Sequence, residues 1–186
     1  MNTHPTTDVK NIPVIETDRL ILRKLNVEDA DDMYEYASNL KVTRHMTWDE
    51  HLSIEQTVFY LLTVEEAYKK RELLDWAVTL KSNKKMIGTC GFTFWNEMHQ
   101  YTELGYVISH KFQRQGYATE CSRALLKLAF TKMDCHRVEA VCFPENTASI
   151  KLLEKLNMQR EGLLRSRLSK NGIRHNLYMY ALLKQS

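Results

Sequence analysis

The sequence predicts a single α+β domain built on a mixed, mostly antiparallel sheet of six to seven strands, flanked by about four helices. Its length of 186 residues suits one domain rather than two. Hydrophobic residues make up 44% and charged residues 26%, with only 6 Gly and 3 Pro, a composition that excludes disordered and collagen-like chains. Strand-like and helix-like segments alternate so that one parallel unit of strand, helix and strand lies inside an otherwise antiparallel sheet.

Two capping signals predict the helices of the N-terminal part. Asn26, followed by Glu28 and Asp29, places an acceptor side chain and carboxylates where the start of a helix leaves N–H groups free. Ser53-Ile-Glu-Gln56 is a capping box. The elements expected here are a flexible tail over residues 1–13, a strand over 19–25, a helix over 26–38, an irregular segment over 40–52 and a helix over 53–71. The domain itself is expected to span residues 14–186.

Strand periodicity dominates the middle of the chain. Residues 74–80 and 86–95 flank the polar run Lys81-Ser-Asn-Lys-Lys85, which predicts a hairpin. Residues 101–108 are apolar on both faces beyond Glu103, and this pattern argues for a central, buried strand.

The C-terminal part contains the remaining helices and strands. Cys121, Ala124, Leu125 and Leu128 recur at helical spacing, which predicts a helix over residues 117–132. The elements expected after it are a strand over 136–142, a helix that begins at Asn146, and strands over 160–168 and 174–183 around Asn171-Gly172, a favoured pair for a tight hairpin turn.

Charge is unevenly distributed, although the net charge is only +3. Residues 1–95 carry 12 basic and 15 acidic side chains, whereas residues 96–186 carry 14 and 8. A basic half suits a polyanionic partner and an acidic half suits a cationic one. The domain-wide basicity that marks nucleic-acid-binding proteins is absent.

Cysteine usage and hydropathy indicate the compartment. Cys90, Cys121, Cys135 and Cys142 form no CxxC pair, so we expect reduced core thiols rather than a zinc site or a disulfide framework. No apolar run reaches the roughly 18 residues of a membrane span, and residues 1–12 are too polar for a signal peptide. We therefore expect a soluble, cytoplasmic protein with no membrane contact.

The segment Gln113-Arg-Gln-Gly-Tyr-Ala-Thr119 joins the central strand to a helix. A run of N–H groups at a helix start, with Gly116 allowing close approach and Ala118 leaving room, forms a cradle for pyrophosphate. The alternative is an ordinary polar turn closed by glycine. The spacing matches neither a P-loop nor the GxGxxG fingerprint of dinucleotide-binding folds.

The segment Pro144-Glu-Asn-Thr-Ala-Ser149 follows the second strand of the parallel unit. Asn146 at the N-cap can use its side chain locally. Ser149 falls on the buried stripe of the helix, where an unpaired hydroxyl costs about 1–3 kcal/mol. It either donates to a backbone carbonyl or faces a ligand, and both interpretations stay open on the sequence alone.

Glu103 lies where the central strand becomes apolar on both faces. Desolvation raises the pKa of such a carboxyl group and can make it a base near neutral pH. The alternative is a structural Glu paired with a surface cation. Because two strand ends and a helix start of one parallel unit meet at one crevice, these three features point to a single site.

At this point the sequence resembles a family, the GNAT (GCN5-related) N-acetyltransferases. Gln113-x-x-Gly116-x-Ala118 is similar to the motif with which that family holds the pyrophosphate of acetyl-coenzyme A. Four further runs resemble the RimJ/RimL branch, which is named for enzymes that acetylate N-termini of ribosomal proteins: Glu16-Thr-Asp-Arg-Leu-Ile-Leu-Arg23, Glu103-Leu-Gly-Tyr106, Gly116-Tyr-Ala-Thr-Glu120, and Pro144-Glu-Asn-Thr-Ala-Ser149 through Leu153-Glu-Lys-Leu156. The resemblance covers about residues 14–184.

The resemblance implies a GNAT fold, in which the two central parallel strands splay apart and acetyl-CoA, the cosubstrate, lies between them. The residues implied in cofactor binding are Tyr106, Val107 and Ile108 along the pantetheine, Gln113, Arg114, Gln115, Gly116, Tyr117, Ala118 and Thr119 at the pyrophosphate, and Asn146 and Ser149 at the pantetheine arm and the sulfur. No metal is implied.

The resemblance also implies the catalytic roles. Glu103 matches the family's base, and Ser149 is the candidate acid, where other branches commonly use a Tyr. A neutral amine must attack the thioester, so a base has to take a proton from an ammonium that is mostly charged at pH 7. A backbone N–H, expected to be that of Val107, can stabilise the oxyanion.

The acceptor amine is not determined by these motifs. Candidates are a protein N-terminus, including that of a ribosomal protein, and a small amine such as an amino acid, a polyamine or an antibiotic. Residues 41–51 and the helix that begins at Ser53 are expected to line the acceptor pocket, with Trp48, Asp49 and Glu50 as the candidate contacts. We expect a monomer or a homodimer.

Two other functions compete with acetyl transfer. One is a catalytically silent acyl-CoA-binding module, against which the presence of both Glu103 and Ser149 argues. The other is RNA contact, expected only through a ribosome, by a basic patch on the last hairpin formed by Arg160, Arg165, Arg167, Lys170 and Arg174. Charge runs on a terminal hairpin are usually a solvated face.

Overall fold

A computed structural model describes residues 8–185 and shows one mixed sheet in the order β1-β2-β3-β4-β5-β6-β8-β7. Its strands are β1 (Ile15–Glu16), β2 (Leu20–Arg23), β3 (Leu74–Leu80), β4 (Met86–Asn96), β5 (Tyr101–Ile108), β6 (Arg137–Cys142), β7 (Gln159–Lys170) and β8 (Ile173–Leu183). Among the described residues, β5 and β6 form the one parallel pair. The predicted α+β class with a mostly antiparallel sheet is confirmed, and the sheet has eight strands rather than six to seven.

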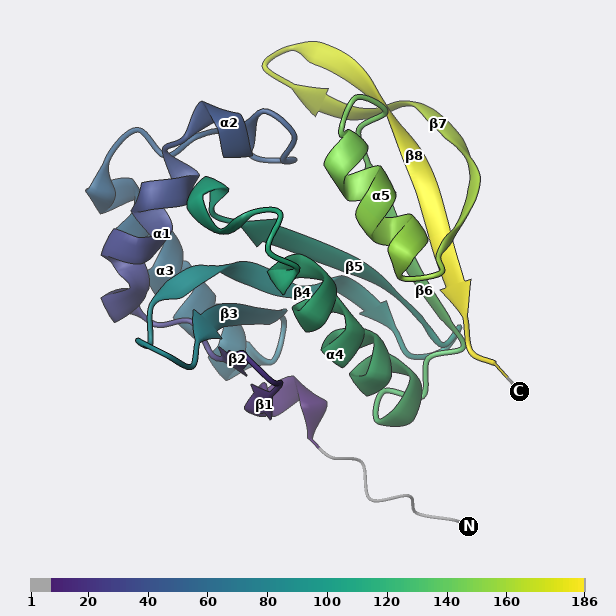
Figure 1. Cartoon of the computed structure of the whole chain (residues 1–186), viewed down its shortest axis with the longest axis horizontal. Helices are drawn as coiled ribbons and strands as arrows, with labels where there is room; N and C mark the ends of the chain where they lie inside the picture. Colours follow the sequence, from purple (N-terminus) through teal and green to yellow (C-terminus); the bar gives the residue numbers. More distant parts are fainter. Residues whose placement is uncertain (1–7, 186) are drawn as a thin grey trace.

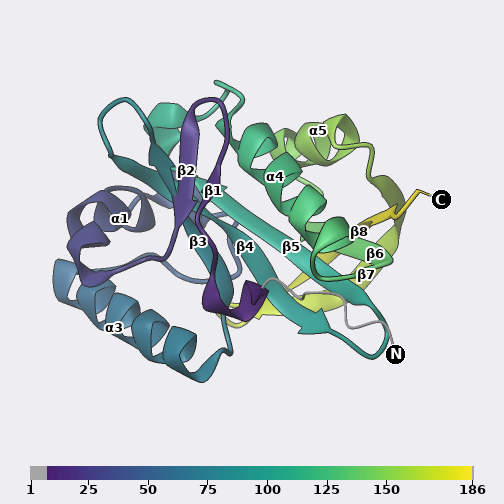
Figure 2. The ribbon, with the colours of Figure 1, turned by 90° about the horizontal axis from the view of Figure 1, so that it is seen from below.

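Helices cover both faces of this sheet. The α-helices are α1 (Ala30–Ala37), α2 (Leu40–Thr43), α3 (Ile54–Lys70), α4 (Tyr117–Thr131) and α5 (Thr147–Lys155), and the short 3-10 helices are η1 (Val9–Asn11), η2 (Val27–Asp29) and η3 (His110–Phe112). Figure 1 and Figure 2 show α1 and α3 on one face and α4 and α5 on the other. The two faces therefore carry separate helix pairs, with the sheet between them.

The differences from the predicted elements have local causes. The strand β1 is only two residues long, too short to show a periodicity in the sequence. Within the segment predicted to be irregular, Asn39 accepts a hydrogen bond from the N–H of Lys41 and caps the single turn of α2. The predicted cap at Asn26 is present, and it opens η2, which leads directly into α1.

The prediction of a flexible tail over residues 1–13 needs a correction. Residues 1–7 lie outside the described residues. Val9 and Ile12, by contrast, are each only 3% exposed and belong to the hydrophobic core. The indole N–H of Trp76 donates to the carbonyl of Pro13 at 2.9 Å. The packed part of the chain therefore begins before residue 14, because these apolar side chains cover the edge of the core.

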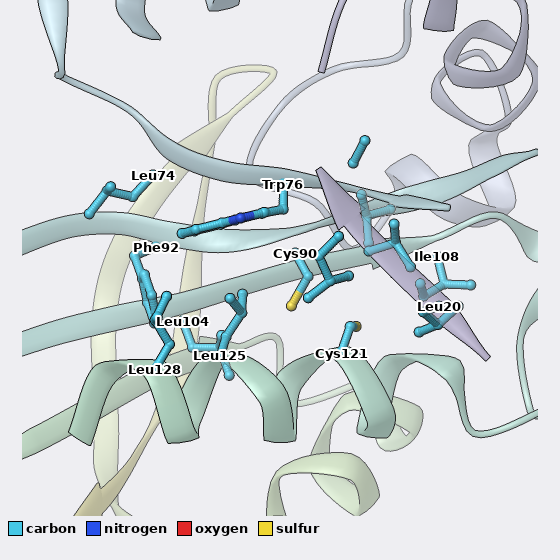
Figure 3. Packing of buried hydrophobic residues seen from close by; sticks show 14 of the residues in the cluster. Leu20, Leu74, Trp76, Cys90, Phe92, Leu104, Ile108, Cys121, Leu125 and Leu128 are labelled. Carbon is cyan, nitrogen blue, oxygen red and sulfur yellow. The ribbon is translucent and has the colours of Figure 1, made fainter. Parts of the chain in front are cut away.

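The main core lies between the sheet and α4 (Figure 3). Trp76 of β3 is fully buried and packs edge-on against Phe92 of β4, with ring centroids 6.2 Å apart. Leu125 of α4 is also fully buried. Burying each such side chain contributes about 1.5–3 kcal/mol, so this layer fixes α4 on the sheet and, with it, the loop that precedes α4.

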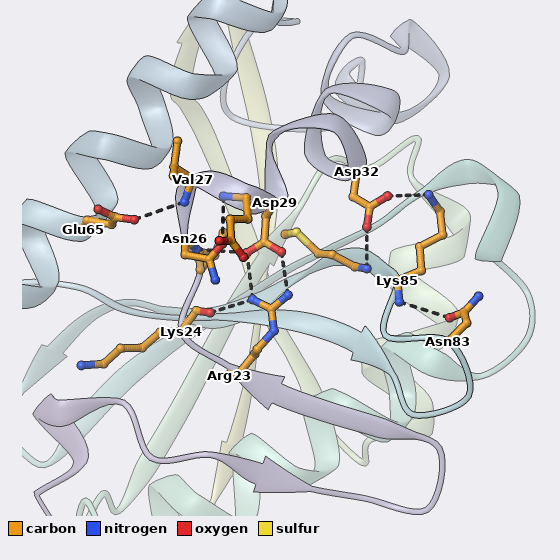
Figure 4. Close-up of polar contacts among 12 residues, drawn as sticks. Arg23, Lys24, Asn26, Val27, Asp29, Asp32, Glu65, Asn83 and Lys85 are labelled. Carbon is orange, nitrogen blue, oxygen red and sulfur yellow. Dashed lines mark hydrogen bonds and ion pairs between the residues drawn. The ribbon is translucent and has the colours of Figure 1, made fainter.

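Polar contacts hold α1 against the other face of the sheet (Figure 4). The Arg23 guanidinium of β2 donates to both carboxylate oxygens of Asp29, at 2.6 and 2.8 Å. Asp32 of α1 accepts from Lys85 at 2.5 Å and from the N–H of Met86 at 2.9 Å. Bidentate and charge-assisted bonds of this kind fix direction as well as distance, so α1 is held in one position over β4.

The central parallel strands splay apart, as expected. β5 and β6 are paired only at Tyr101 with Arg137, Thr102 with Val138, and Glu103 with Glu139. Beyond Glu103, β5 continues to pair with β4 and β6 continues to pair with β8. The strands therefore diverge, and the edge of β5 that faces β6 is left open.

Among residues 8–185, no helix combines the length and the apolar character needed to cross a bilayer.

Candidate active site

A cavity of about 480 Å³ lies where β5 and β6 diverge. Its walls come from α1, the segment between α2 and α3, α3 itself, strands β3 to β6, β8, and the start of α5. Of the residues predicted for the site, those that line the cavity are Trp48, Glu103, Tyr106, Val107, Asn146 and Ser149. Asp49, Glu50, Ile108 and residues 113–119 are not among its lining residues.

The open end of β5 presents alternate backbone groups to the cavity and to β4. The N–H of Ser109 donates to the carbonyl of Ile87 of β4, and the side chain of Gln113 donates to the carbonyl of Ile108. The carbonyl of Val107 lies close to Gly88 of β4, where any Cβ would collide with it. Since backbone groups alternate along a strand, the polar groups of Tyr106 and Ile108 face the open edge and those of Val107 face β4.

This alternation changes the expected oxyanion donor. The N–H of Val107 was expected in that role, but it points toward β4. The N–H of Tyr106 faces the open edge beside the cavity and takes its place as the candidate. The side chain of Val107 still lines the cavity.

The first turn of α5 brings two hydroxyl groups together. Asn146 caps the helix by accepting from the N–H of Ser149 at 3.1 Å, which is the local use that its position predicted. The Ser149 hydroxyl is 2.6 Å from the Tyr106 hydroxyl. Ser149 therefore faces the cavity and a side-chain partner rather than a backbone carbonyl, and it links α5 to β5.

Burial changes the acidity of the groups around this contact. It raises the pKa of Tyr106 well above its usual value, and the bond to Ser149 acts in the opposite direction. Burial also raises the pKa of the Cys142 thiol, which lines the same cavity. Both groups are therefore neutral near pH 7, and the hydroxyl pair can donate hydrogen bonds.

Glu103 is half-buried on β5 and lines the cavity. One of its carboxylate oxygens accepts from the Thr93 hydroxyl at 2.8 Å. Within residues 8–185, Glu103 forms no ion pair with a Lys or Arg side chain. This arrangement disfavours the alternative of a structural Glu paired with a surface cation.

The loop before α4 has the geometry of an anion cradle. Gly116, at the N-cap of α4, has φ 86°, a left-handed conformation that glycine adopts without strain. No side chain caps this helix, and none of the N–H groups of residues 114–119 donates a hydrogen bond within the described part of the chain. The side chains of Gln113 and Gln115 donate instead to the carbonyls of Ile108 and Lys111, so they shape the loop from within. Free N–H groups at a helix start suit a phosphate.

Arg19, from the turn before β2, completes this cradle. Its guanidinium stacks on the Tyr117 ring at 4.3 Å and donates to the carbonyl of Gln115 at 3.0 Å. It also pairs with Glu120 of α4 at 2.7 Å, and one of its nitrogens lies beside Gly116. The sequence motif around Arg19 was recognised, but its role was not, because the contact joins residues about a hundred positions apart.

Asp75 of β3 is a second carboxyl group in the cavity, and the sequence analysis missed it. Burial raises its pKa to about 7, while the N–H of Trp76, which donates to it at 3.1 Å, and the Thr89 hydroxyl act in the opposite direction. The side chain remains reachable from the cavity although protein surrounds it on most sides. The available signal was a single acid in the otherwise apolar run of β3.

Aromatic side chains form a further part of the cavity wall. Trp48 packs against His51, and His51 against Tyr60 of α3, each pair with ring centroids 5.8 Å apart. His51 also hydrogen bonds to the Thr57 hydroxyl at 2.8 Å. Burial lowers the pKa of His51, so this ring is neutral near pH 7.

Lys170 holds that wall in place from the β7–β8 hairpin. Its ammonium donates to the carbonyls of Thr43, Met46 and Trp48, at 2.7, 3.0 and 2.9 Å. Its side chain is only 10% exposed. Lys170 is therefore not part of a solvated basic patch, in which the sequence placed it, but fixes the backbone of the segment that carries Trp48.

No group of three or more His, Cys, Asp or Glu side chains suited to hold a metal ion occurs within residues 8–185.

Comparison with known proteins gives consistent results. Residues 19–159 match the family model described as an acetyltransferase (GNAT) domain. YoaA of Bacillus subtilis strain 168, named as an uncharacterized N-acetyltransferase, is 34% identical over 172 residues, which cover 92% of this chain and 97% of YoaA. The [ribosomal protein uS5]-alanine N-acetyltransferase of Escherichia coli K12 is 26% identical over 170 residues, 87% of each chain.

A solved structure shows the same fold. The crystal structure of a GNAT-family acetyltransferase from Bacillus anthracis superposes with a TM-score of 0.81 at 29% identity, over 92% of this chain and 98% of that one.

Proposed function

This chain belongs to the GNAT acetyltransferase family and is an acetyl-CoA-dependent N-acetyltransferase, and we propose that it moves the acetyl group directly to a primary amine within a ternary complex. The observation that carries the proposal is the convergence at the open end of β5. Glu103, the backbone of Tyr106 and the Ser149 hydroxyl all border one cavity. A silent acyl-CoA-binding module has no need of an acid and a base at the same cavity.

Acetyl-CoA supplies an activated acetyl thioester. The free N–H groups of residues 114–119 and the guanidinium of Arg19 would hold its pyrophosphate. The open edge of β5 offers the backbone groups of Tyr106 and Ile108 to the pantetheine, as a sheet edge does to an added strand. Asn146 borders the same space at the start of α5.

Glu103 is the proposed base. It lines the cavity without a cationic partner among the described residues, so it is free to take a proton from the acceptor ammonium, directly or through one water. The Thr93 hydroxyl orients one of its carboxylate oxygens and leaves the other available. The N–H of Tyr106 is the proposed donor that stabilises negative charge on the carbonyl oxygen.

Ser149 is the proposed acid. Its hydroxyl borders the cavity at the first turn of α5, where the helix dipole favours negative charge, so it can donate to the departing sulfur. The Tyr106 hydroxyl, 2.6 Å away, can in turn donate to Ser149. Other branches of the family commonly use a Tyr as the acid. Here a Tyr hydroxyl is hydrogen bonded to the candidate acid Ser149.

The acceptor is proposed to be a primary amine that enters between α1, Trp48 and β3. A protein N-terminus is one candidate, which the name of the uS5-alanine relative supports. A small amine is the other, supported by an aromatic-walled cavity of about 480 Å³. The four buried free cysteines suit a reducing compartment and support a cytoplasmic location as part of this proposal.

The test is thiol release from acetyl-CoA, measured across a panel of amines, peptides and ribosomal proteins. Direct transfer predicts intersecting initial-velocity patterns and no acetylated enzyme. Parallel patterns, or an acetyl group retained on the protein, would contradict direct transfer. Saturable acetyl-CoA binding without thiol release on any acceptor would instead support the silent module.

A further inference from the structure

Asp75 has no role in the transfer just described, yet its environment is costly for a carboxylate. It faces the cavity from β3, and within residues 8–185 it has no Lys or Arg partner. A buried carboxylate that has no cationic partner in the folded protein is suited to bind a positively charged ligand.

The register of the sheet places Asp75 and Glu103 around a common point. Asp75 is opposite Gly91 on β4, and Gly91 is opposite Gly105 on β5. Residues in one cross-strand row point to the same face, and so does Glu103, two positions before Gly105. The Cα atoms of the two acids are two strand spacings apart across the sheet and two residues apart along it, a separation of roughly 12 Å. Side chains that extend from both Cα atoms can bring the two carboxyl groups closer together than this.

Open space lies between the two acids. A Cβ at Gly91 would collide with a carboxylate oxygen of Asp75 and also with the Leu74 carbonyl and the Asp75 Cα, so β3 and β4 approach closely here and the Asp75 carboxylate lies beside Gly91 of β4. A Cβ at Gly105 would meet only the Thr93 methyl group, at 3.4 Å. The position above Gly105 is therefore free, with Asp75 on one side and Glu103 on the other.

The cavity around this position has a negative balance of charge. Its lining contains these two carboxyl groups and no Lys or Arg. Burial lowers the pKa of both His45 and His51, which are neutral near pH 7. Lys170 is directed at three backbone carbonyls behind the wall. The aromatic rings of Tyr36, Trp48 and Tyr60 complete an environment suited to an ammonium.

We propose that Asp75 and Glu103 hold the acceptor ammonium between them above Gly105, and that the acceptors are primary amines with no anionic group beside the reacting nitrogen. This inference rests on the proposed function. A peptide N-terminus, an alkylamine and an amino acid amide satisfy it. A free amino acid does not, because its carboxylate would lie against two acids with no cation to compensate.

The test compares acceptors that differ in one charge, L-alaninamide and L-alanine, by kcat/KM for thiol release. For each enzyme, kcat/KM for L-alaninamide is divided by kcat/KM for L-alanine. The readout is this ratio in the wild type relative to the same ratio in a variant, because the different basicities of the two amines then cancel. Asp75→Asn should reduce kcat/KM for the amide about 10- to 100-fold and narrow the ratio by a similar factor. Asp75→Glu should retain most of the wild-type ratio between the two acceptors.

Asp31→Asn is the matched control. It removes the same charge from an exposed position on α1, the helix that supplies Tyr36 to the cavity, and should leave the ratio unchanged. An unchanged ratio in Asp75→Asn, or an equal narrowing in Asp31→Asn, would overturn the inference while amine-dependent thiol release still upheld the proposed function. Thiol release with no amine would refute both.

A measurement on the wild type covers the case in which Asp75→Asn does not fold. Propyltrimethylammonium cannot be acetylated and should inhibit competitively against the amine. Its carboxylate analogue of similar size, 4-methylpentanoate, should inhibit at least about 10-fold more weakly. Equal inhibition by the two ions would contradict a site selective for cations.

Discussion

The Tyr106 and Ser149 hydroxyl oxygens lie 2.6 Å apart and join the splayed end of β5 to the first turn of α5. This contact crosses the gap that backbone pairing leaves open beyond Glu103. It makes the proposed acid a pair rather than a single residue, and the first prediction follows from that pairing.

Ser149→Ala should lower kcat about 10- to 100-fold and change acetyl-CoA affinity little, because a bond that strengthens as the thiolate leaves acts in the transition state. Tyr106→Phe should have a smaller effect of the same kind. If the hydroxyls act as a unit, the double variant should lose less than the product of the two single losses. A rise in the acetyl-CoA KM at constant kcat would make Ser149 a binding or capping residue.

Glu103→Gln keeps the shape of the side chain and removes the proposed base, so kcat at neutral pH should fall about 10²- to 10⁴-fold. The ascending limb of the pH–rate profile should change with it, and part of the rate should return above about pH 9, where free amine needs no base. Thr93→Val, which removes only the hydrogen bond to Glu103, should cost much less. Wild-type turnover per folded molecule at pH 7 would rule out this assignment.

Gly116→Ala should remove most of the thermal stabilisation by acetyl-CoA, which is about 2.7 kcal/mol at 100 times the dissociation constant. The substitution both strains a left-handed residue and places a methyl group in the proposed cradle. Gly162→Ala is the control, because a Cβ there meets nothing within 4 Å. Calorimetry with coenzyme A separates the two effects, since strain alone lowers the melting temperature without weakening binding.

Arg19→Ala should weaken coenzyme A binding, because one cation near the pyrophosphate is removed. For the same reason, the affinity of the variant for coenzyme A should fall less steeply with rising salt concentration than that of the wild type. Arg19→Lys should restore part of the affinity but not the contact with Tyr117, since only a planar guanidinium stacks well on a ring. Equal affinity in both variants and the wild type would make Arg19 a purely structural partner of Glu120.

Asp75→Asn should stabilise the ligand-free protein at pH 8 more than at pH 4. The pKa of Asp75 is raised from 3.8 to about 7, so the folded form keeps a proton that the unfolded form loses in that range. Stability from this group therefore falls as pH rises from about 4 to about 7 and stays low above it. The advantage of Asn should grow by roughly 4 kcal/mol between pH 4 and pH 8, measured by urea unfolding. A pH-independent difference would contradict the raised pKa.

Local signals predicted much of the fold. The caps at Asn26 and Asn146 and the Ser53 cap are all present, because a cap depends on residues three positions away or fewer. The loop from Gln113 to Thr119 was also identified from its own residues. These features depend only on residues close together in the sequence, so they can be recognised without knowledge of the tertiary structure.

The missing parts of the site depend on contacts that no local pattern records. Arg19 meets Glu120 across 101 residues, and Lys170 meets Trp48 across 122. Asp75 becomes a cavity residue only through the register that places it opposite Gly91. The direction of the Val107 N–H likewise required the pairing of β5 with β4, since alternation fixes a direction only once one bond is known.

The reach of Lys170 to the carbonyls of residues 43, 46 and 48 also bears on biosynthesis. A nascent chain that has emerged as far as residue 158 already contains the Gly116 loop, the hydroxyl pair and both splayed strands. It lacks the hairpin whose Lys170 supports the segment around Trp48, and it lacks β8, which lies between β6 and β7. Because elements leave the ribosome in chain order, the segment that carries Trp48 gains its support from Lys170 only after the proposed cofactor-binding loop has been made.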